Sequence, residues 1–193
     1  MKTLLISAAF AAAVIAPSAA SAQAIPGAVI AVVDLDRVTM QCNACKTAQA
    51  SLQGQLTALQ NRQKALAGPL ETEGKAIQAA VDALNGKEPD AALKTRAQNW
   101  ETRRSQAAQE ISRQQQQLQA NSQYVTKQVM EKLGPIYRQV MQRRGANVLV
   151  SSDATLATST SVDVSNDVLA ALNTAMPTIA TTAPAAPKQP QGR

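Results

Sequence analysis

The chain has 193 residues, a formal net charge of +6 and no histidine. Without histidine it lacks the usual general base near neutral pH and the commonest metal ligand, so no catalytic, metal or cofactor-binding residues are predicted and we do not expect an enzyme. Aromatic residues make up only 2% of the sequence and the cations are spread among carboxylates, so nucleic acid is not expected as a partner.

The first 22 residues have the three-part layout of a cleavable secretory signal peptide. Lys2 gives a positive start, an apolar stretch runs from Leu4 to Ala16, and Ala20-Ser21-Ala22 is the cleavage site. The apolar stretch is shorter than the ~20 residues of a membrane-spanning helix. We therefore expect an exported, soluble protein. Its net charge, which falls from +6 to +5 when Lys2 is lost, can attract acidic polypeptides or anionic lipid.

Residues 28–34 read Ala-Val-Ile-Ala-Val-Val-Asp, which is apolar and rich in β-branched residues. This composition predicts a buried strand. A short helical or turn segment with Asp36 and Arg37 should follow it.

The next hundred residues predict a helical hairpin. Apolar residues recur at alternating spacings of three and four from Cys42 to Leu84 and again from Leu93 to Val125, which is the seam of a coiled coil. Folding the chain at Lys87 brings the two seams together, antiparallel, over residues 45–133. The expected seam pairs are Leu84 with Leu93, Ile77 with Trp100, Leu70 with Ala107, Leu66 with Ile111, Leu59 with Leu118 and Leu52 with Val125, and the expected polar pairs are Glu73 with Arg104 and Gln63 with Gln114.

Two Gly-Pro pairs interrupt this pattern. Gly68-Pro69 predicts a kink in the outgoing arm, because proline removes a backbone donor and clashes one turn back. Gly134-Pro135 is interpreted as the place where the return arm ends and its helix packs onto the body.

The remaining chain predicts the rest of a small body. Arg143-Arg144-Gly145 should close the return helix. Residues 146–151 form a second strand, and residues 154–158 are a candidate third. Ser165 is the expected N-cap of a final helix that runs from Asn166 to about Thr174. From residue 176 the sequence is rich in Ala, Thr and Pro and is expected to be disordered.

These boundaries give an α+β protein with four parts. They are the signal peptide (1–22), a β-rich body (23–44 and 134–175), the coiled-coil hairpin (45–133) and a disordered tail (176–193). A sheet of two or three short strands is only marginally stable alone. We therefore expect copies of the chain to cover both sheet faces. The predicted core of this shared sheet is Val29, Ile30, Val32, Val33, Val148, Leu149 and Val150.

Three segments together resemble a known family. They are the strand that continues through Asp34-Leu35-Asp36-Arg37, the strand Ala146 to Val150, and the run Val162-Asp163-Val164-Ser165-Asn166-Asp167-Val168-Leu169. Flanking a long hairpin in an exported chain, they resemble the OmpH/Skp family of periplasmic chaperones. The resemblance implies a periplasmic homotrimer, with hairpins hanging like tentacles from a shared barrel and holding unfolded outer-membrane proteins without ATP.

The chain departs from the family at the hairpin tip, which is basic in well-known members. Residues 71–96 carry Lys75, Lys87, Lys94 and Arg96 against Glu71, Glu73, Asp82, Glu88 and Asp90. This balance argues against contact between the tips and an anionic membrane surface, the other candidate partner. The candidates for steering acidic clients are Arg96 at the edge of the tip and, further along the return arm, Arg103, Arg104 and Arg113; the alternative is an ordinary solvated face.

Cys42 and Cys45 form the sharpest local motif. They fit a structural disulfide of an oxidising compartment better than a thiol–disulfide exchange site, because the usual βαβ setting of such a site is absent.

The predicted hairpin, the export signal and the family resemblance make a holdase chaperone the leading hypothesis. An envelope adaptor protein and a thiol–disulfide protein are the alternatives.

Overall fold

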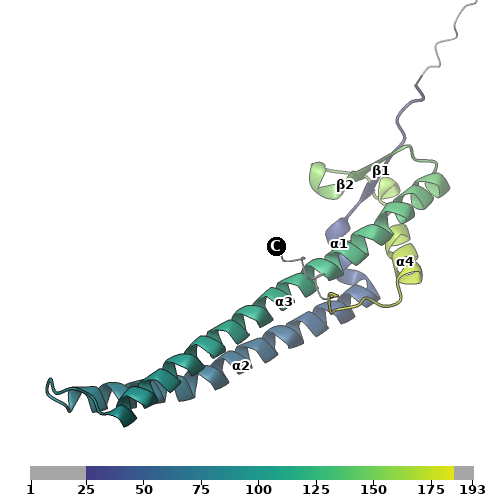
Figure 1. Cartoon of the computed structure of the whole chain (residues 1–193). Helices are drawn as coiled ribbons and strands as arrows, with labels where there is room; N and C mark the ends of the chain where they lie inside the picture. Colours follow the sequence, from purple (N-terminus) through teal and green to yellow (C-terminus); the bar gives the residue numbers. More distant parts are fainter. Residues whose placement is uncertain (1–24, 185–193) are drawn as a thin grey trace, which may run out of the picture.

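The computed structural model describes residues 25–184, so the signal peptide predicted over residues 1–22 lies outside it. Two long helices form an antiparallel hairpin that projects from a small body (Figure 1). The elements in chain order are β1 (Ile30–Val33), α1 (Leu35–Gln41), α2 (Asn43–Asp82), α3 (Ala91–Arg144), β2 (Val148–Ser151), the short 3₁₀ turns η1 (Ser152–Ala154) and η2 (Thr160–Val162), and α4 (Ser165–Ala175). The predicted α+β class, with a long helical hairpin on a small sheet, is confirmed.

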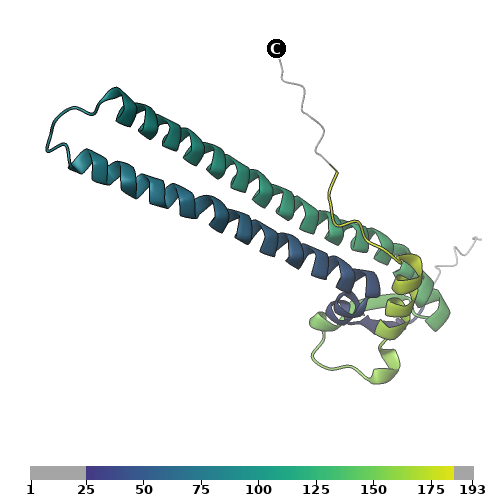
Figure 2. The ribbon, with the colours of Figure 1, turned by 90° about the horizontal axis from the view of Figure 1, so that it is seen from below.

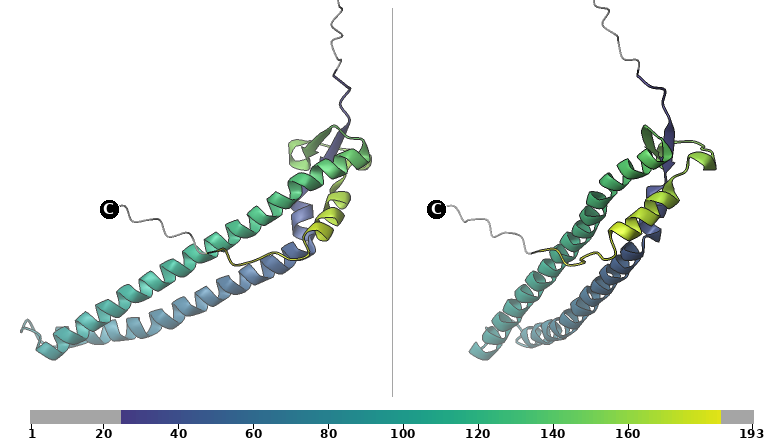
Figure 3. Two further views of the ribbon diagram at one scale, coloured as in Figure 1. Left: turned by 45° about the vertical axis from the view of Figure 1, so that its right-hand side comes forward. Right: turned by 90° about the vertical axis from the view of Figure 1, so that its right-hand side faces the viewer.

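Helices α2 and α3 are the arms of the hairpin, with 40 and 54 residues. Each continues through its proline, Pro69 in α2 and Pro135 in α3, and α2 bends only gently along its length (Figure 3). The kink predicted at Gly68-Pro69 therefore does not break α2, and the return helix packs onto the body at Gly134-Pro135, as predicted. The neighbouring Leu133, Ile136 and Val140 are buried in the body, and burial of three such side chains outweighs the roughly 3 kcal/mol that a proline costs inside a helix.

The hairpin tip follows from local backbone chemistry. Helix α2 ends at Asp82, and the turn after it places Asn85 (φ 49°) and Gly86 (φ 85°) in the left-handed region that these two residue types tolerate best. Asp90 then caps α3, because its carboxylate accepts a hydrogen bond of 2.7 Å from the backbone N–H of Leu93. The predicted pairing of Leu84 with Leu93 thus falls at a turn rather than between two helices.

The body is built on a parallel pair of strands. β1 pairs with β2 in a register that sets Ile30 against Val148 and Val33 against Ser151, so the whole hairpin is the crossover between them. The third strand expected over residues 154–158 does not form. Thr155 instead donates its backbone N–H and its hydroxyl to the carbonyl of Ser152, which closes a local turn.

The core of the body lies where β1, α1, α4 and the last turns of α3 meet (Figures 1 and 2). Val38, Leu133, Val140, Val168 and Leu172 are fully buried there. Helix α3 ends as predicted, with Arg143 and Arg144 in its last turn and Gly145 (φ 68°) as its left-handed C-cap. The end of the return arm is therefore part of the body.

A polar cluster joins β1, α1 and α4. Ser165 is the first residue of α4 rather than its predicted N-cap, and its Oγ accepts from the Asp34 N–H (2.8 Å) and donates to Asp163 Oδ1 (2.6 Å). Arg37 donates to Asp163 Oδ2 at 2.7 Å. Burial raises the pKa of Asp163, but the hydrogen bonds from Ser165 and Arg37 outweigh burial and hold that pKa below its ordinary value. The run 162–169 noted in the sequence is thus the junction of three elements.

The chain after α4 turns back over the hairpin. Residues 177–184, which we call the strap, cross both arms near the body (Figures 2 and 3). Met176 is 4% exposed and Ile179 packs against the body core. The structure thus differs from the prediction of disorder from residue 176: residues 176–184 are packed, and the later ones lie outside the described range.

Candidate binding surfaces

The seam of the hairpin is only half covered, because just two helices share it. Beyond the body, Leu59 (8% exposed) and Ile77 (9%) are the apolar seam residues of α2 that are buried. The other apolar seam residues remain partly exposed: Leu52, Leu56, Leu66, Leu70, Leu84, Leu93, Trp100, Ala107, Ile111, Leu118 and Val125. The arms therefore present a long, shallow apolar surface to the surroundings.

This surface is hollowed on two sides halfway along the arms. Leu66, Leu70 and Ala107 line both hollows, one together with Pro69 and the other together with Ile111. The predicted pairs of Leu70 with Ala107 and Leu66 with Ile111 therefore lie at one level. Nearer the body, Leu52 and Val125 line a further shared groove, in agreement with their predicted pairing.

Nearer the tip, Trp100 contacts α2 at Leu70 and Gly74, and its pairing with Ile77 stays a prediction. Its Nε1–H donates to the carbonyl of Leu70 at 2.8 Å, and a Cβ added at Gly74 would lie 3.0 Å from the ring. The indole therefore occupies the space that Gly74 leaves open. The guanidinium of Arg104 lies over the ring, 5.4 Å from its centroid. A glycine within a helical pattern opposite a tryptophan is the signal that could have indicated this contact.

The predicted pair of Glu73 with Arg104 is wrong. Glu73 accepts two hydrogen bonds from Arg96, at 2.8 and 3.3 Å, and Arg103 lies 3.9 Å away. Arg96 and Arg103 are seven residues apart and share one face of α3, whereas Arg104 lies a further 100° around the helix, beside Trp100 and Glu101. The hydrogen bond from Arg96 is the main cause of a pKa of Glu73 below its usual value.

A second ion pair joins the arms further down. Arg62 donates to both carboxylate oxygens of Glu110, at 2.6 and 3.1 Å, and this hydrogen bonding lowers the pKa of Glu110, with a smaller contribution from Arg113. The four predicted steering residues therefore do not form one strip. Arg96 and Arg103 face Glu73, Arg104 lies on Trp100 and Arg113 lies near Glu110. Their role in steering stays a prediction.

The tip cations are also close to carboxylates. Lys75 donates to Glu71 and Lys94 to Glu88, each at 2.6 Å. Together with the overall balance of charge over residues 71–96, these pairs leave little net positive potential at the tip.

The predicted sheet core divides into two groups. Val32 and Val33 are 4% and 3% exposed, and Leu149 packs against the body core. Val29, Ile30 and Val148 are instead 51%, 49% and 38% exposed, and Val150 is partly buried. Within one chain the start of each strand is therefore an uncovered apolar edge.

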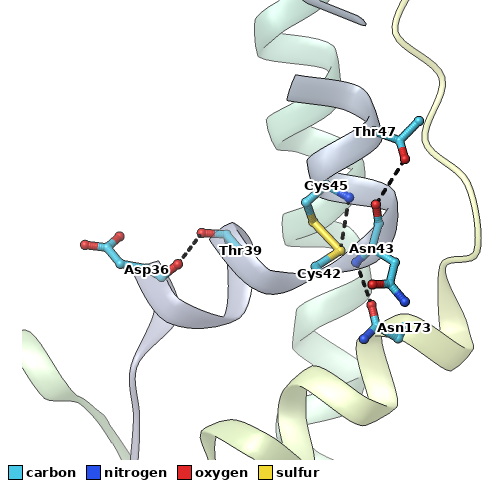
Figure 4. Close-up of a disulfide and its surroundings, with 7 residues drawn as sticks. All are labelled: Asp36, Thr39, Cys42, Asn43, Cys45, Thr47 and Asn173. Atoms are coloured by element: carbon cyan, nitrogen blue, oxygen red, sulfur yellow. Dashed lines mark hydrogen bonds between the residues drawn. A yellow bond between two sulfur atoms is a disulfide. The ribbon is translucent and has the colours of Figure 1, made fainter. Parts of the chain in front are cut away.

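Cys42 and Cys45 are joined in a disulfide at the start of α2 (Figure 4). Cys42 is fully buried, and its sulfur accepts the backbone N–H of Cys45 at 3.2 Å, so it also caps the helix. Next to it, the N–H of Asn43 donates to Asn173 Oδ1 of α4 at 2.8 Å. The disulfide thus lies where the body packs against the start of the hairpin, a position that suits a structural role.

Within residues 25–184, no three potential ligands among Cys, Asp and Glu gather as a metal site. In the same range, no helix is long and apolar enough to cross a membrane.

One polar site was not predicted. Side-chain amides of both arms meet beneath the strap, where Asn121 Nδ2 donates to Gln55 Oε1 at 2.7 Å and Gln117 Nε2 donates to Asn121 Oδ1 at 2.8 Å. Asn121 is 4% exposed, although it occupies a seam position. A buried asparagine in a coiled-coil seam requires hydrogen-bond partners, so Asn121 at its seam position was the sequence signal that could have indicated this polar site.

Fold and surfaces together define an α+β protein whose long hairpin offers open contact surfaces along both arms. Residues 29–172, most of the chain, match the family model of OmpH-like outer membrane proteins, and the chain belongs to this family. It is also similar to a crystal structure from Caulobacter crescentus CB15, described as a proposed outer membrane chaperone (OmpH-like), with a TM-score of 0.69 and 19% identity over 86% of this chain and 96% of that one. At that identity the likeness establishes a shared fold. Among curated proteins, none matches the sequence significantly. The resemblance recognised in the sequence is confirmed.

Proposed function

We propose that this protein is a chaperone that holds unfolded outer-membrane proteins in the periplasm without ATP, acting by binding and not by catalysis. The observation that carries the proposal is the half-exposed apolar seam along two arms of 40 and 54 residues. Membership of the OmpH-like family and the chaperone description of the similar Caulobacter structure support it. Export to the periplasm rests on the signal peptide predicted over residues 1–22.

A shallow seam suits a client that has no fixed shape. An unfolded outer-membrane protein exposes apolar side chains at many places, and each can cover one part of the seam, such as the hollows lined by Leu66 and Leu70. Each contact removes little apolar area, at about 25 cal/mol per Å², so each is weak and reversible. Many contacts along one arm act together because each further contact is intramolecular. Binding and release then need no fuel.

We further propose that the protein is a homotrimer. Two short strands are marginal alone, and Val29, Ile30 and Val148 form an exposed apolar edge that another copy can cover. Three hairpins on one shared sheet would surround a client. Client capture by the four candidate cations, Arg96, Arg103, Arg104 and Arg113, would weaken with salt, because exposed charges are screened. The near-neutral tip makes an anionic membrane surface the less favoured partner.

The test is the aggregation of an unfolded outer-membrane barrel diluted from urea, with solution mass measured in parallel. We expect suppression at a modest molar excess of trimer. A double variant, Leu66→Gln with Ile111→Gln, should suppress less, because it places amides on the seam. The matched control, Ala58→Gln with Ala76→Gln, changes two exposed positions of α2 and should behave as wild type.

Aggregation as fast as without the protein would refute the proposal. A stoichiometric complex with an export channel, in the absence of any effect on unfolded proteins, would favour the envelope adaptor instead. Loss of suppression in Cys42→Ser with Cys45→Ser, at unchanged helical content, would favour the thiol–disulfide alternative.

A further inference from the structure

The strap is bound to the hairpin as an extended segment. Ile179, Thr181 and Ala183 are partly buried, while Ala180, Thr182 and Pro184 are exposed. This alternation with a period of two is typical of a strand lying on a surface. The inward side chains after Ile179 are small, so the strap fills no deep pocket.

The hairpin contacts the strap mainly through the strap's main chain. Gln128 recognises both main-chain groups of Ala180: its Nε2 donates to the carbonyl at 2.8 Å and its Oε1 accepts the N–H at 3.1 Å. Gln55 Nε2 donates to the carbonyl of Thr181 at 3.2 Å. These are the bonds that a neighbouring β-strand would make.

Asn121 completes the set by accepting the N–H of Ala183 at 2.8 Å. Among the described residues, only the contact between the hydroxyls of Ser51 and Thr181, at 3.0 Å, involves a hydrogen bond to a side chain of the strap. We call Gln55, Asn121 and Gln128 the amide ladder. Carboxamides carry a donor and an acceptor, so the ladder can bond to the main chain of almost any extended segment, whatever its sequence.

We propose that the amide ladder is a binding site for extended polypeptide and that the strap occupies it in cis until a segment of an unfolded client replaces it. The inference rests on the proposed function and names the part of the client that is recognised, its main chain. Because the strap is tethered directly to α4, its effective concentration at the ladder is high. A client therefore displaces it only when it also covers the apolar seam, and the returning strap promotes release.

The site remains satisfied when its occupant changes. Asn121 keeps its bonds to Gln117 and Gln55 without the strap, and Gln128 Nε2 also donates to the carbonyl of Tyr124 at 3.2 Å. Ordered amides of this kind can exchange one main chain for another, or for water, without leaving a buried polar group unpaired.

The first test opens the site within the full chain. Ala180→Pro with Ala183→Pro removes the two N–H groups that Gln128 and Asn121 accept, whereas Thr182→Pro changes a residue whose N–H makes no hydrogen bond within residues 25–184. The probe is a fluorescein-labelled peptide, Pro-Thr-Ile-Ala-Thr-Thr-Ala-Pro, which repeats residues 177–184 in trans. We expect the double variant to bind it about tenfold more tightly than wild type or Thr182→Pro, since two strap bonds are lost. Adding Gln128→Ala should abolish the gain. Equal binding by all four proteins would overturn the inference.

The second test needs no substitution. Hydrogen exchange of the wild-type protein should show protected amides at Ala180 and Ala183 that lose protection when an unfolded outer-membrane barrel is bound. Protection that does not change with bound client would overturn the inference while leaving the holdase function intact. Peptide binding at the opened ladder by a protein that never suppresses aggregation would instead refute only the proposed function.

Discussion

The contact between Trp100 and Gly74 gives a prediction in which two effects of similar size oppose each other. Glycine inside a helix costs about 1 kcal/mol relative to alanine, so Gly→Ala in an open part of α2 should stabilise the protein. An added Cβ at Gly54 meets nothing within 4 Å. We therefore expect Gly54→Ala to raise the free energy of unfolding by about 0.5–1 kcal/mol.

At Gly74 the same substitution meets the indole. The new Cβ would lie 3.0 Å from Cζ2 and 3.3 Å from Cε2 of Trp100, tighter than ordinary contact. The ring must move by a few tenths of an ångström, which lengthens its 2.8 Å bond to the carbonyl of Leu70. Such a bond contributes about 1 kcal/mol, so the gain and the loss nearly cancel. Gly74→Ala should be about 1 kcal/mol less stable than Gly54→Ala.

The assay is urea unfolding at one fixed protein concentration, followed by helical circular dichroism and by fluorescence. Trp100 is the only tryptophan, so its emission reports directly on the contact. We expect an altered native emission in Gly74→Ala and an unchanged one in Gly54→Ala. Equal stabilisation by both variants, with identical emission, would refute the packing of Trp100 on Gly74 and with it this register of the hairpin.

Three further predictions concern the tip, the body and the disulfide. Asp90→Ala removes the cap of α3 and should cost about 1 kcal/mol, with faster amide exchange confined to the first turn, and Asp90→Asn should restore most of it. Because the pKa of Asp163 is lower in the folded than in the unfolded protein, its ionised carboxylate stabilises the fold at pH values above about 4, the pKa of an unfolded aspartate. This contribution is lost as the pH falls from there through the pKa of the folded state. Asp163→Asn should therefore flatten the acid limb of a stability–pH curve, and an unchanged limb would refute the role of this cluster. Reducing the disulfide should lower the free energy of unfolding by about 2 kcal/mol, because the crosslink restricts the unfolded chain. Suppression of aggregation should stay unchanged, because buried Cys42 takes no part in binding. A mass shift of two hydrogens verifies reduction.

Periodicity predicted most of the hairpin, because a seam of two helices is written directly into the spacing of apolar residues. It placed Leu66, Leu70, Ala107 and Ile111 at one level correctly. It failed for Glu73, because a long arginine side chain on a neighbouring face can reach a carboxylate better than the residue directly opposite. It also placed the join between the return helix and the body near Pro135 correctly, where the flanking apolar residues are buried.

The strap could not be predicted from its own residues. Its Ala, Thr and Pro side chains carry no helical or strand pattern strong enough to indicate packing, and its bonds go mainly through the main chain. The information lies in the receiving residues: Asn121, which reads as an ordinary polar interruption of the seam, and Gln55 and Gln128, which lie outside the predicted seam. The candidate surface on the arms was predicted in outline, but its depth depends on how little of the seam two helices can cover.

The most direct test of the account is where a client touches the protein. A photoreactive amino acid in place of Leu66 lies in the hollows of the hairpin, and the same amino acid in place of Leu156 lies on a fully exposed loop of the body. With an unfolded outer-membrane barrel bound, the account predicts strong crosslinks from position 66 and few from position 156, although the latter is the more accessible. Crosslinks mainly from position 156 would contradict binding along the arms.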